Sequence, residues 1–270
     1  SATAMPGLYA GKADLALLGR ENNITDDNGF GRVKLYAPRR FELMTGSLAT
    51  EGKAPALVVL VHRDNPLARL TLAQLDALFS CEHRRSPATL RTWGQLGLTG
   101  EWADRPIHLY GYDAETGTGQ YFARTVLGGS RKLNWENFRE FKNSRNLDGT
   151  ALPASQQILE ALRADPWGLA VGSLRYADER VKALPLAADD GSPFVSATAD
   201  TLISRAYPLT RLTYAFVDQP PGRPLDPKVK EFLRYIFSRQ GQDDILRDRG
   251  YLPLKPEILA AQLHQLEGTP

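Results

Sequence analysis

Cysteine is nearly absent from this 270-residue sequence: Cys81 is the only one, so no disulfide can form within the chain. The four histidines, His62, His83, His108 and His264, do not have the spacing of metal ligands. His83 follows Cys81 closely, but no orienting residue completes a catalytic set, and an ordinary loop thiol is the favoured interpretation. The sequence therefore shows neither an activated nucleophile nor a metal cluster, which argues against an enzyme such as a phosphatase and predicts no cofactor and no metal site.

The sequence also lacks a charge excess and a long hydrophobic run. Its 33 basic and 31 acidic residues leave a net charge of +2, which argues against a nucleic-acid partner. The longest apolar run, residues 54–61, is too short to span a bilayer, and the first residues do not have the pattern of a signal peptide. With 42% hydrophobic and 24% charged residues, the composition is typical of globular proteins. We expect either a cytosolic protein or a processed piece of an exported one.

Short apolar runs alternate with helical patterns along the chain. Residues 4–9 predict a helix, residues 14–18 a strand, residues 22–31 a loop, and residues 33–36 and 41–44 two alternating strands. Residues 56–62 predict a strand buried on both faces, as in parallel sheets. Thr71 and Asp226 are placed to begin helices. The alternation predicts an α/β fold with mostly parallel sheets.

Residues 107–122 read as a strand, a tight turn and the start of a helix. The turn contains Thr116, Gly117 and Thr118, where the first N–H groups of a helix have no internal acceptor. Glycine lets a ligand approach the backbone, and the helix dipole favours an anion there. Threonine is also an ordinary helix cap. From this segment alone, an oxyanion site and a simple cap both remain open.

Six segments occur in a characteristic order: residues 4–21, 62–80, 116–122, 155–172, 207–211 and 226–253. The third, with Phe122, is similar to an S-G-T-x-x-x-F loop, and the last ends in a G-Y-[L/V]-P-L pattern. Together they resemble the phosphate-binding proteins of ABC transporters, a branch of the type II periplasmic solute-binding superfamily. The resemblance implies two α/β lobes joined by two crossing strands, near residues 62–65 and 204–210, with the ligand in the cleft between the lobes. Lobe one would comprise residues 1–62 plus 208–270 and lobe two residues 63–207, and a strand and helix start that precede this point in the family would be missing.

The resemblance also implies an oxyanion held by hydroxyls and backbone N–H groups. Thr116 and Thr118 would donate hydroxyl hydrogen bonds, and the N–H groups of Gly117 and Thr118 would point at the anion. Asp113 would be the acidic partner, which selects an oxyanion that still carries a proton.

Two further residues match the family's site in lobe one. Ser1 aligns with a serine at a helix start, or is a plain helix cap. Arg20 occupies the position of a cleft residue, or forms a structural ion pair with Glu21 or a neighbour.

The sequence departs from the family pattern just before the turn. Tyr112 stands where the family has an arginine, and Glu115 places a negative charge directly before Thr116. The loss of a bidentate arginine removes a contact worth roughly 1.5–3 kcal/mol. Arg20 and Arg145 are candidate replacements.

The expected function is an exported solute-binding protein, periplasmic or secreted and monomeric. It would capture an oxyanion, with inorganic phosphate as the leading candidate, and deliver it to an ABC transporter permease. The alternative is a protein that kept the fold, lost the oxyanion, and serves as a sensory, adhesion or scaffold protein.

Overall fold

The computed structural model describes residues 3–50 and 53–268, and the chain divides into two compact units. Unit 1 consists of residues 1–55, 202–204 and 210–270, and unit 2 of residues 56–201 and 205–209. The first boundary therefore lies before residue 56, not after residue 62 as predicted. The reason is that β3 (Val58–His62) pairs with two strands of unit 2 and so belongs to that sheet.

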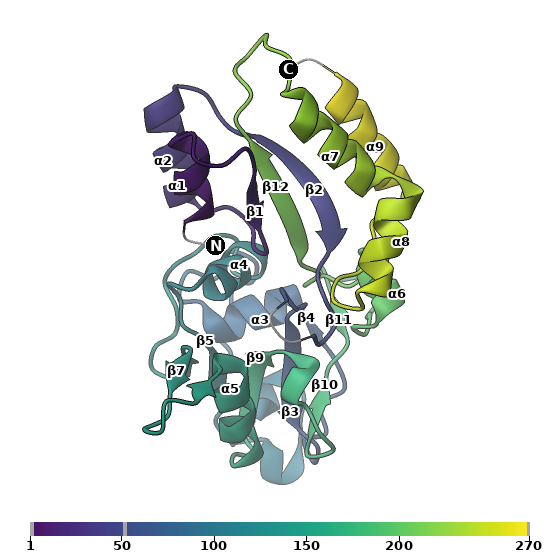
Figure 1. Ribbon diagram of the computed structural model, residues 1–270. Coiled ribbons are helices and arrows are strands. Elements are labelled where there is room, and N and C mark those ends of the chain that lie inside the picture. Colours follow the sequence, from purple (N-terminus) through teal and green to yellow (C-terminus); the bar gives the residue numbers. More distant parts are fainter. Residues whose placement is uncertain (1–2, 51–52, 269–270) are drawn as a thin grey trace. The chain divides into compact units, whose positions relative to one another are not determined.

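Unit 1 is a three-stranded sheet with helices on both faces (Figure 1). The strand order is β1 (Ala16–Leu18), β12 (Leu212–Val217) and β2 (Arg39–Thr45), and both pairings are antiparallel. One face is covered by α1 (Ala4–Tyr9) and α2 (Ile24–Lys34), and the other by α7 (Pro227–Phe237) and α9 (Pro256–Glu267). Helix α8 (Arg239–Arg247) links the last two.

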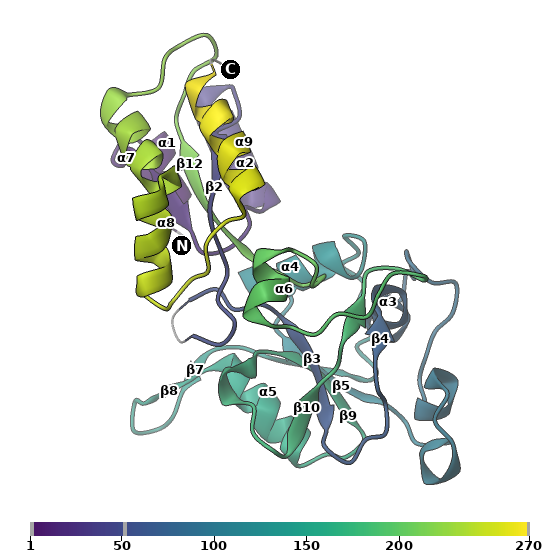
Figure 2. The same ribbon diagram turned by 90° about the vertical axis from the view of Figure 1, so that its right-hand side faces the viewer.

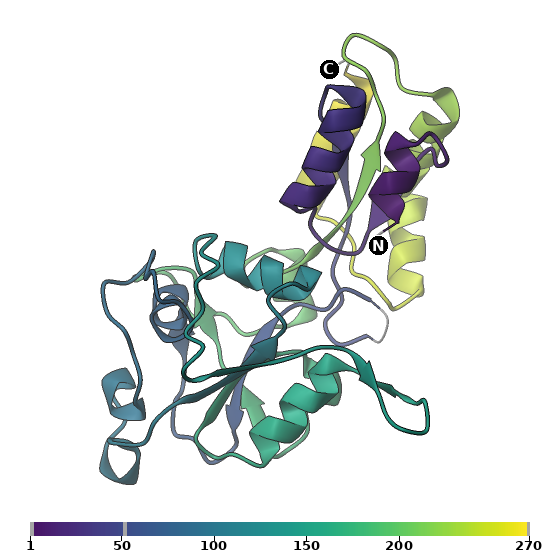
Figure 3. The ribbon, with the colours of Figure 1, turned by 90° about the vertical axis from the view of Figure 1, so that its left-hand side faces the viewer.

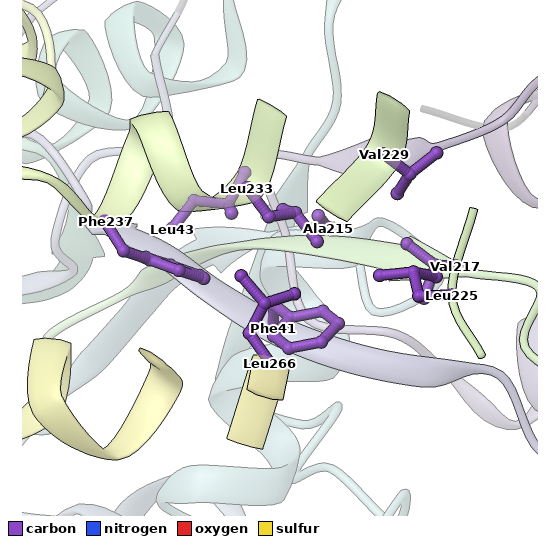
Figure 4. Close-up of a cluster of buried hydrophobic side chains, with 9 residues drawn as sticks. All are labelled: Phe41, Leu43, Ala215, Val217, Leu225, Val229, Leu233, Phe237 and Leu266. Carbon is purple, nitrogen blue, oxygen red and sulfur yellow. The ribbon is translucent and has the colours of Figure 1, made fainter. Parts of the chain in front are cut away.

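The two faces of β12 explain this layering. Ala215 and Val217 point to the α7 and α9 side, whereas Tyr214 and Phe216 point to the α1 and α2 side, which is the two-residue period of a strand buried on both faces. Figure 4 shows the first of these cores. Its members are Phe41, Leu43, Ala215, Val217, Leu225, Val229, Leu233, Phe237 and Leu266.

Helix α2 corrects the prediction of a loop over residues 22–31 and of a strand over residues 33–36. Asn23 and Asp26 form a complete capping box, and the Phe30 ring is fully buried beside α1. The remaining residues of α2 are mostly polar, which is why no apolar period marks it in the sequence.

Unit 2 is built on a five-stranded mixed sheet in the order β10–β3–β9–β5–β6. Strands β5 (His108–Tyr112), β6 (Phe138–Phe141) and β9 (Gly168–Gly172) pair in parallel, whereas β3 is antiparallel to β9 and to β10 (Val181–Ala183). The α/β class is confirmed. Within this sheet, the expectation of parallel pairing holds for β5, β6 and β9 but not for β3, which is buried on both faces and yet pairs antiparallel with both neighbours.

Three helices pack around this sheet: α3 (Leu72–Phe79), α4 (Gly117–Thr125) and α5 (Ala154–Arg163), the last beside β9 (Figure 2). Strands β4 (Leu70–Thr71) and β11 (Leu186–Ala187) form a short parallel pair. Strands β7 (Ser144–Arg145) and β8 (Ala151–Leu152) form a hairpin that extends away from the body of the unit (Figure 3). Helix α6 (Ala199–Ile203) lies at the second boundary in the chain. Among the described helices, none has the length and apolar character needed to cross a membrane.

Candidate functional site

The predicted strand, turn and helix over residues 107–122 are confirmed: β5 ends at Tyr112 and α4 begins at Gly117. Thr116 is the N-cap, with extended backbone angles and an Oγ1 atom that accepts the Gly119 N–H at 3.1 Å. Its carbonyl accepts the Gln120 N–H at 2.9 Å, which is the first full helical hydrogen bond. The local sequence thus forms a capped helix start directly after a central strand.

The Thr116 hydroxyl is engaged within the turn. It donates its hydrogen to the Asp113 carbonyl at 2.6 Å while it accepts from Gly119. A hydroxyl has one hydrogen to donate. In this arrangement Thr116 shapes the turn, and the predicted donation from Thr116 to an anion would require the bond to Asp113 to break.

Two carboxylates accept hydrogen bonds from the backbone N–H groups just before Thr116. Asp113 Oδ1 accepts the Glu115 N–H at 2.8 Å, and Glu140 Oε2 accepts the Ala114 N–H at 3.0 Å. Glu140 comes from β6, where it lies opposite Gly111 in the parallel pairing with β5. Glu140 is not among the residues predicted from the sequence, because only the pairing of β5 with β6 places it beside the turn.

The first two helical residues supply the N–H groups at the start of α4. Gly117 and Thr118 occupy the first positions of α4, where a helix supplies no carbonyl for their N–H groups, and both are half-buried. Gly119 is required for the tight approach behind them: a Cβ there would lie 2.3 Å from the Asp113 carbonyl oxygen. The structure therefore brings Asp113, Gly117 and Thr118 together with the Thr116 cap in unit 2.

Arg20 belongs to unit 1, directly after β1, and forms a bidentate ion pair with Asp26 at 2.6 and 3.1 Å. Its Nη1 also donates to the Glu21 carbonyl at 2.9 Å. The structural ion pair considered for Arg20 is thus present, with Asp26 rather than the Glu21 carboxylate as the partner. The Glu21 carboxylate pairs instead with the buried Arg211 at 3.2 Å.

Asp26 is well suited to hold this guanidinium. Burial raises the pKa of the Asp26 carboxyl, but the hydrogen bonds from Arg20 and from the Asn23 N–H, together with the Arg20 charge, outweigh burial and bring the pKa below its ordinary value. Asp26 is therefore ionised over the physiological range and holds Arg20 in place.

Arg145 and Cys81 are not part of this arrangement. Arg145 donates to the Gly149 carbonyl at 2.8 Å within its own hairpin, so it is engaged locally. Ser1 lies outside the described residues. Cys81 is exposed, and its Sγ contacts the Leu133 carbonyl at 3.4 Å. Within the described ranges, no group of three or more metal-ligating side chains occurs.

Comparison with known proteins agrees with this architecture. Residues 54–240 match the family model described as a PBP superfamily domain. The phosphate-binding protein PstS of Pseudomonas aeruginosa is 31% identical over 267 residues, which cover 98% of this chain and 76% of that protein.

Two solved structures share the fold at low identity. An ABC-type phosphate transport receptor from Vibrio cholerae has a TM-score of 0.61 at 18% identity, with 93% of this chain and 84% of that one covered. PstS from Borrelia burgdorferi has a TM-score of 0.58 at 17% identity, with 94% and 85% covered. The superfamily model matches most of this chain, and the PstS relative aligns with nearly all of it. The chain therefore belongs to the PBP superfamily and is a homologue of the phosphate-binding protein PstS.

Proposed function

We propose that this protein is an exported, periplasmic or secreted solute-binding protein that captures an oxyanion, with inorganic phosphate as the leading ligand, for an ABC transporter permease. The observation that carries the proposal is the capped start of α4, where the half-buried Gly117 and Thr118 present helix-start N–H groups on a turn shaped by Thr116. Such a helix start attracts anions because its first N–H groups have no acceptor within the helix and because the helix dipole is positive there. The Pseudomonas aeruginosa relative is named for phosphate binding, and the Vibrio cholerae structure for phosphate transport.

The charges at the turn favour a protonated oxyanion over a fully ionised one. The carboxylates of Asp113 and Glu140 each accept a backbone N–H of the turn, and Glu115 is exposed beside them. A ligand that still carries a proton can donate to a carboxylate oxygen, whereas sulfate would meet it with lone pairs only. We therefore infer a preference for phosphate over sulfate.

The protein would act as a binding protein and a monomer, without enzymatic activity and without a nucleic-acid partner. Its homologues are binding proteins. The near balance of 33 basic and 31 acidic residues gives no basic excess for a nucleic-acid backbone.

A second candidate is a protein that kept the fold but lost the oxyanion, and serves as a sensory, adhesion or scaffold protein. Three observations favour it. The Thr116 hydroxyl already donates to the Asp113 carbonyl, Arg20 is held by Asp26, and Tyr112 replaces the arginine expected from the family resemblance.

Calorimetric titration of the mature protein with phosphate, sulfate and molybdate separates the two candidates. The transport proposal expects saturable heat with phosphate and weaker or no binding of sulfate, and it fails if none of the three anions binds. Thr118→Ala should weaken phosphate binding, since it removes a hydroxyl at the helix start. The matched control is Thr99→Ala, an exposed threonine of unit 2 whose side chain makes no cap hydrogen bond.

A further inference from the structure

The C-terminal end of α4 is held by two arginines from the loop of residues 80–87, which follows α3. Arg85 donates from Nε to the Val126 carbonyl at 2.7 Å and from Nη2 to the Thr125 carbonyl at 2.8 Å. Arg84 Nη1 donates to the Gly128 carbonyl at 2.9 Å. The last carbonyls of a helix have no N–H partner within it, so the Arg85 guanidinium supplies donors that the helix itself lacks. Arg84 binds the chain just beyond the helix, at Gly128.

Arg85 is in turn fixed by α3. Its backbone N–H donates to Asp76 Oδ2 at 2.7 Å, and Asp76 is fully buried in α3. The same helix contacts the middle of α4, where the Phe79 and Phe122 rings pack edge to face with their centroids 5.0 Å apart. Helix α4 is thus supported by α3 at two levels, directly through the aromatic pair and at its C-terminal end through Arg85.

A nine-residue helix is a rigid rod of about 13 Å. A change at its C-terminal end is therefore transmitted to the direction in which its first N–H groups point. Two nitrogens of one guanidinium donate to consecutive carbonyls, and this pair of hydrogen bonds restrains both the position and the tilt of the helix end. A single hydrogen bond would restrain only its position. The positive charge also complements the partial negative charge at the helix C-terminus.

We propose that Arg85 is a positioning residue for the oxyanion site, because it sets the axis of α4 from the end opposite the ligand. This inference rests on the proposed function, in which the N–H groups of Gly117 and Thr118 contact the anion. Arg85 itself touches no ligand. Its effect passes through the backbone of α4.

The first test is the affinity for inorganic phosphate, measured by calorimetry on the full chain. Arg85→Ala should weaken binding roughly tenfold, as expected for misdirected charge-assisted contacts. The matched control is Arg91→Ala, which removes an exposed arginine that pairs with the exposed Glu136 at 3.3 Å. The control should stay within twofold of the wild type, and an equal loss in both variants would overturn the proposal.

Two further measurements separate positioning from a general loss of stability or charge. Methylguanidinium, added at millimolar concentration, should restore phosphate affinity to Arg85→Ala and leave Arg91→Ala unchanged. Arg85→Lys keeps the charge but not the forked geometry, so it should remain weakened. Full affinity in Arg85→Lys, or no rescue by methylguanidinium, would overturn the positioning role.

A ligand-free measurement keeps this inference distinct from the proposed function. In amide NMR spectra of the free protein, Arg85→Ala should shift the signals of Gly117 and Gly119, at the far end of α4 from the altered contact. Absence of binding of phosphate, sulfate and molybdate by the wild type would refute the proposed function, while these shifts would still test the role of Arg85. Unchanged Gly117 and Gly119 signals in Arg85→Ala would overturn the inference.

Discussion

Arg20 and Asp26 form a two-point ion pair that joins the end of β1 to the first turn of α2. The guanidinium nitrogens lie 2.6 and 3.1 Å from the two carboxylate oxygens. Asp26 is only 9% exposed, and its Oδ2 also accepts the Asn23 N–H that closes the capping box of the helix. The Asp26 carboxylate therefore both caps α2 and binds Arg20, which the family resemblance had predicted as a ligand-binding residue.

We predict that Asp26→Asn lowers the free energy of unfolding at pH 7 by about 1.5–3 kcal/mol, the range for hydrogen bonds to charged groups. The substitution keeps the size of the side chain and removes its charge. Urea unfolding followed by circular dichroism measures the effect. Asp14→Asn, at an exposed position in the same unit, is the control and should change stability by less than about 0.5 kcal/mol.

The same pair predicts a pH dependence. The pKa of Asp26 in the folded protein lies below its ordinary value of 3.8, so its ionised form adds stability above that pH, and the contribution disappears as the pH falls through the folded pKa. The stability difference between the wild type and Asp26→Asn should be steady from pH 7 to about pH 5 and shrink at lower pH. A difference that stays constant to the acid-unfolding limit would contradict this account of Asp26.

Gly119→Ala should disturb the candidate site directly. The added Cβ would lie 2.3 Å from the Asp113 carbonyl oxygen and 2.9 Å from Ala114 Cα, and both are backbone atoms that can move only with the turn. We expect a loss of stability of about 1–3 kcal/mol and a loss of phosphate binding. The loss should be seen in thermal unfolding and in calorimetric titration.

The control for Gly119 is the same substitution at Gly31 in α2, where no heavy atom lies within 4 Å of the added Cβ. There alanine should raise stability by about 0.5–1 kcal/mol, because it restricts the unfolded chain and favours the helix. If both substitutions changed the free energy of unfolding in the same direction, the close contact at Gly119 would not be the cause of the stability loss.

Thr116→Ala should lower stability by about 1 kcal/mol, because it removes an N-cap whose hydroxyl bonds Gly119 and Asp113. Thr116→Ser keeps the hydroxyl and should lose less than about half of that amount. Chemical denaturation of the two variants provides the comparison. Equal losses in both would show that the methyl group, rather than the cap, stabilises the turn.

Phosphate affinity should rise when the charges before Thr116 are changed toward the family pattern. Tyr112→Arg would supply the missing guanidinium and should tighten binding by about tenfold or more. Glu115→Gln removes an exposed negative charge at the helix start and should give a smaller gain that declines with added salt. Glu179→Gln, at an exposed position elsewhere in unit 2, should leave affinity unchanged. Weaker binding in Tyr112→Arg would argue that the site serves another ligand.

The sequence alone determined the features that depend on neighbouring residues. Thr71 and Asp226 cap helices as predicted, and the turn before Gly117 has the predicted conformation. Each of these caps and turns depends on hydrogen bonds within one helical turn, so the residues that predict it lie close together in the sequence. The polar helix α2 was missed because its stability comes from one capping box and the burial of Phe30, which leave no apolar period.

The tertiary structure decided which distant residues meet. Glu140 reaches the turn because β6 pairs with β5, and Arg85 reaches the end of α4 from a loop that precedes it by about forty residues. The sequence predicts that Arg20 follows a strand. Only the position of α2 shows that the Arg20 guanidinium forms an ion pair with Asp26. Strand pairing and such long-range contacts follow from the packing of the whole sheet and its helices, and no local pattern encodes them.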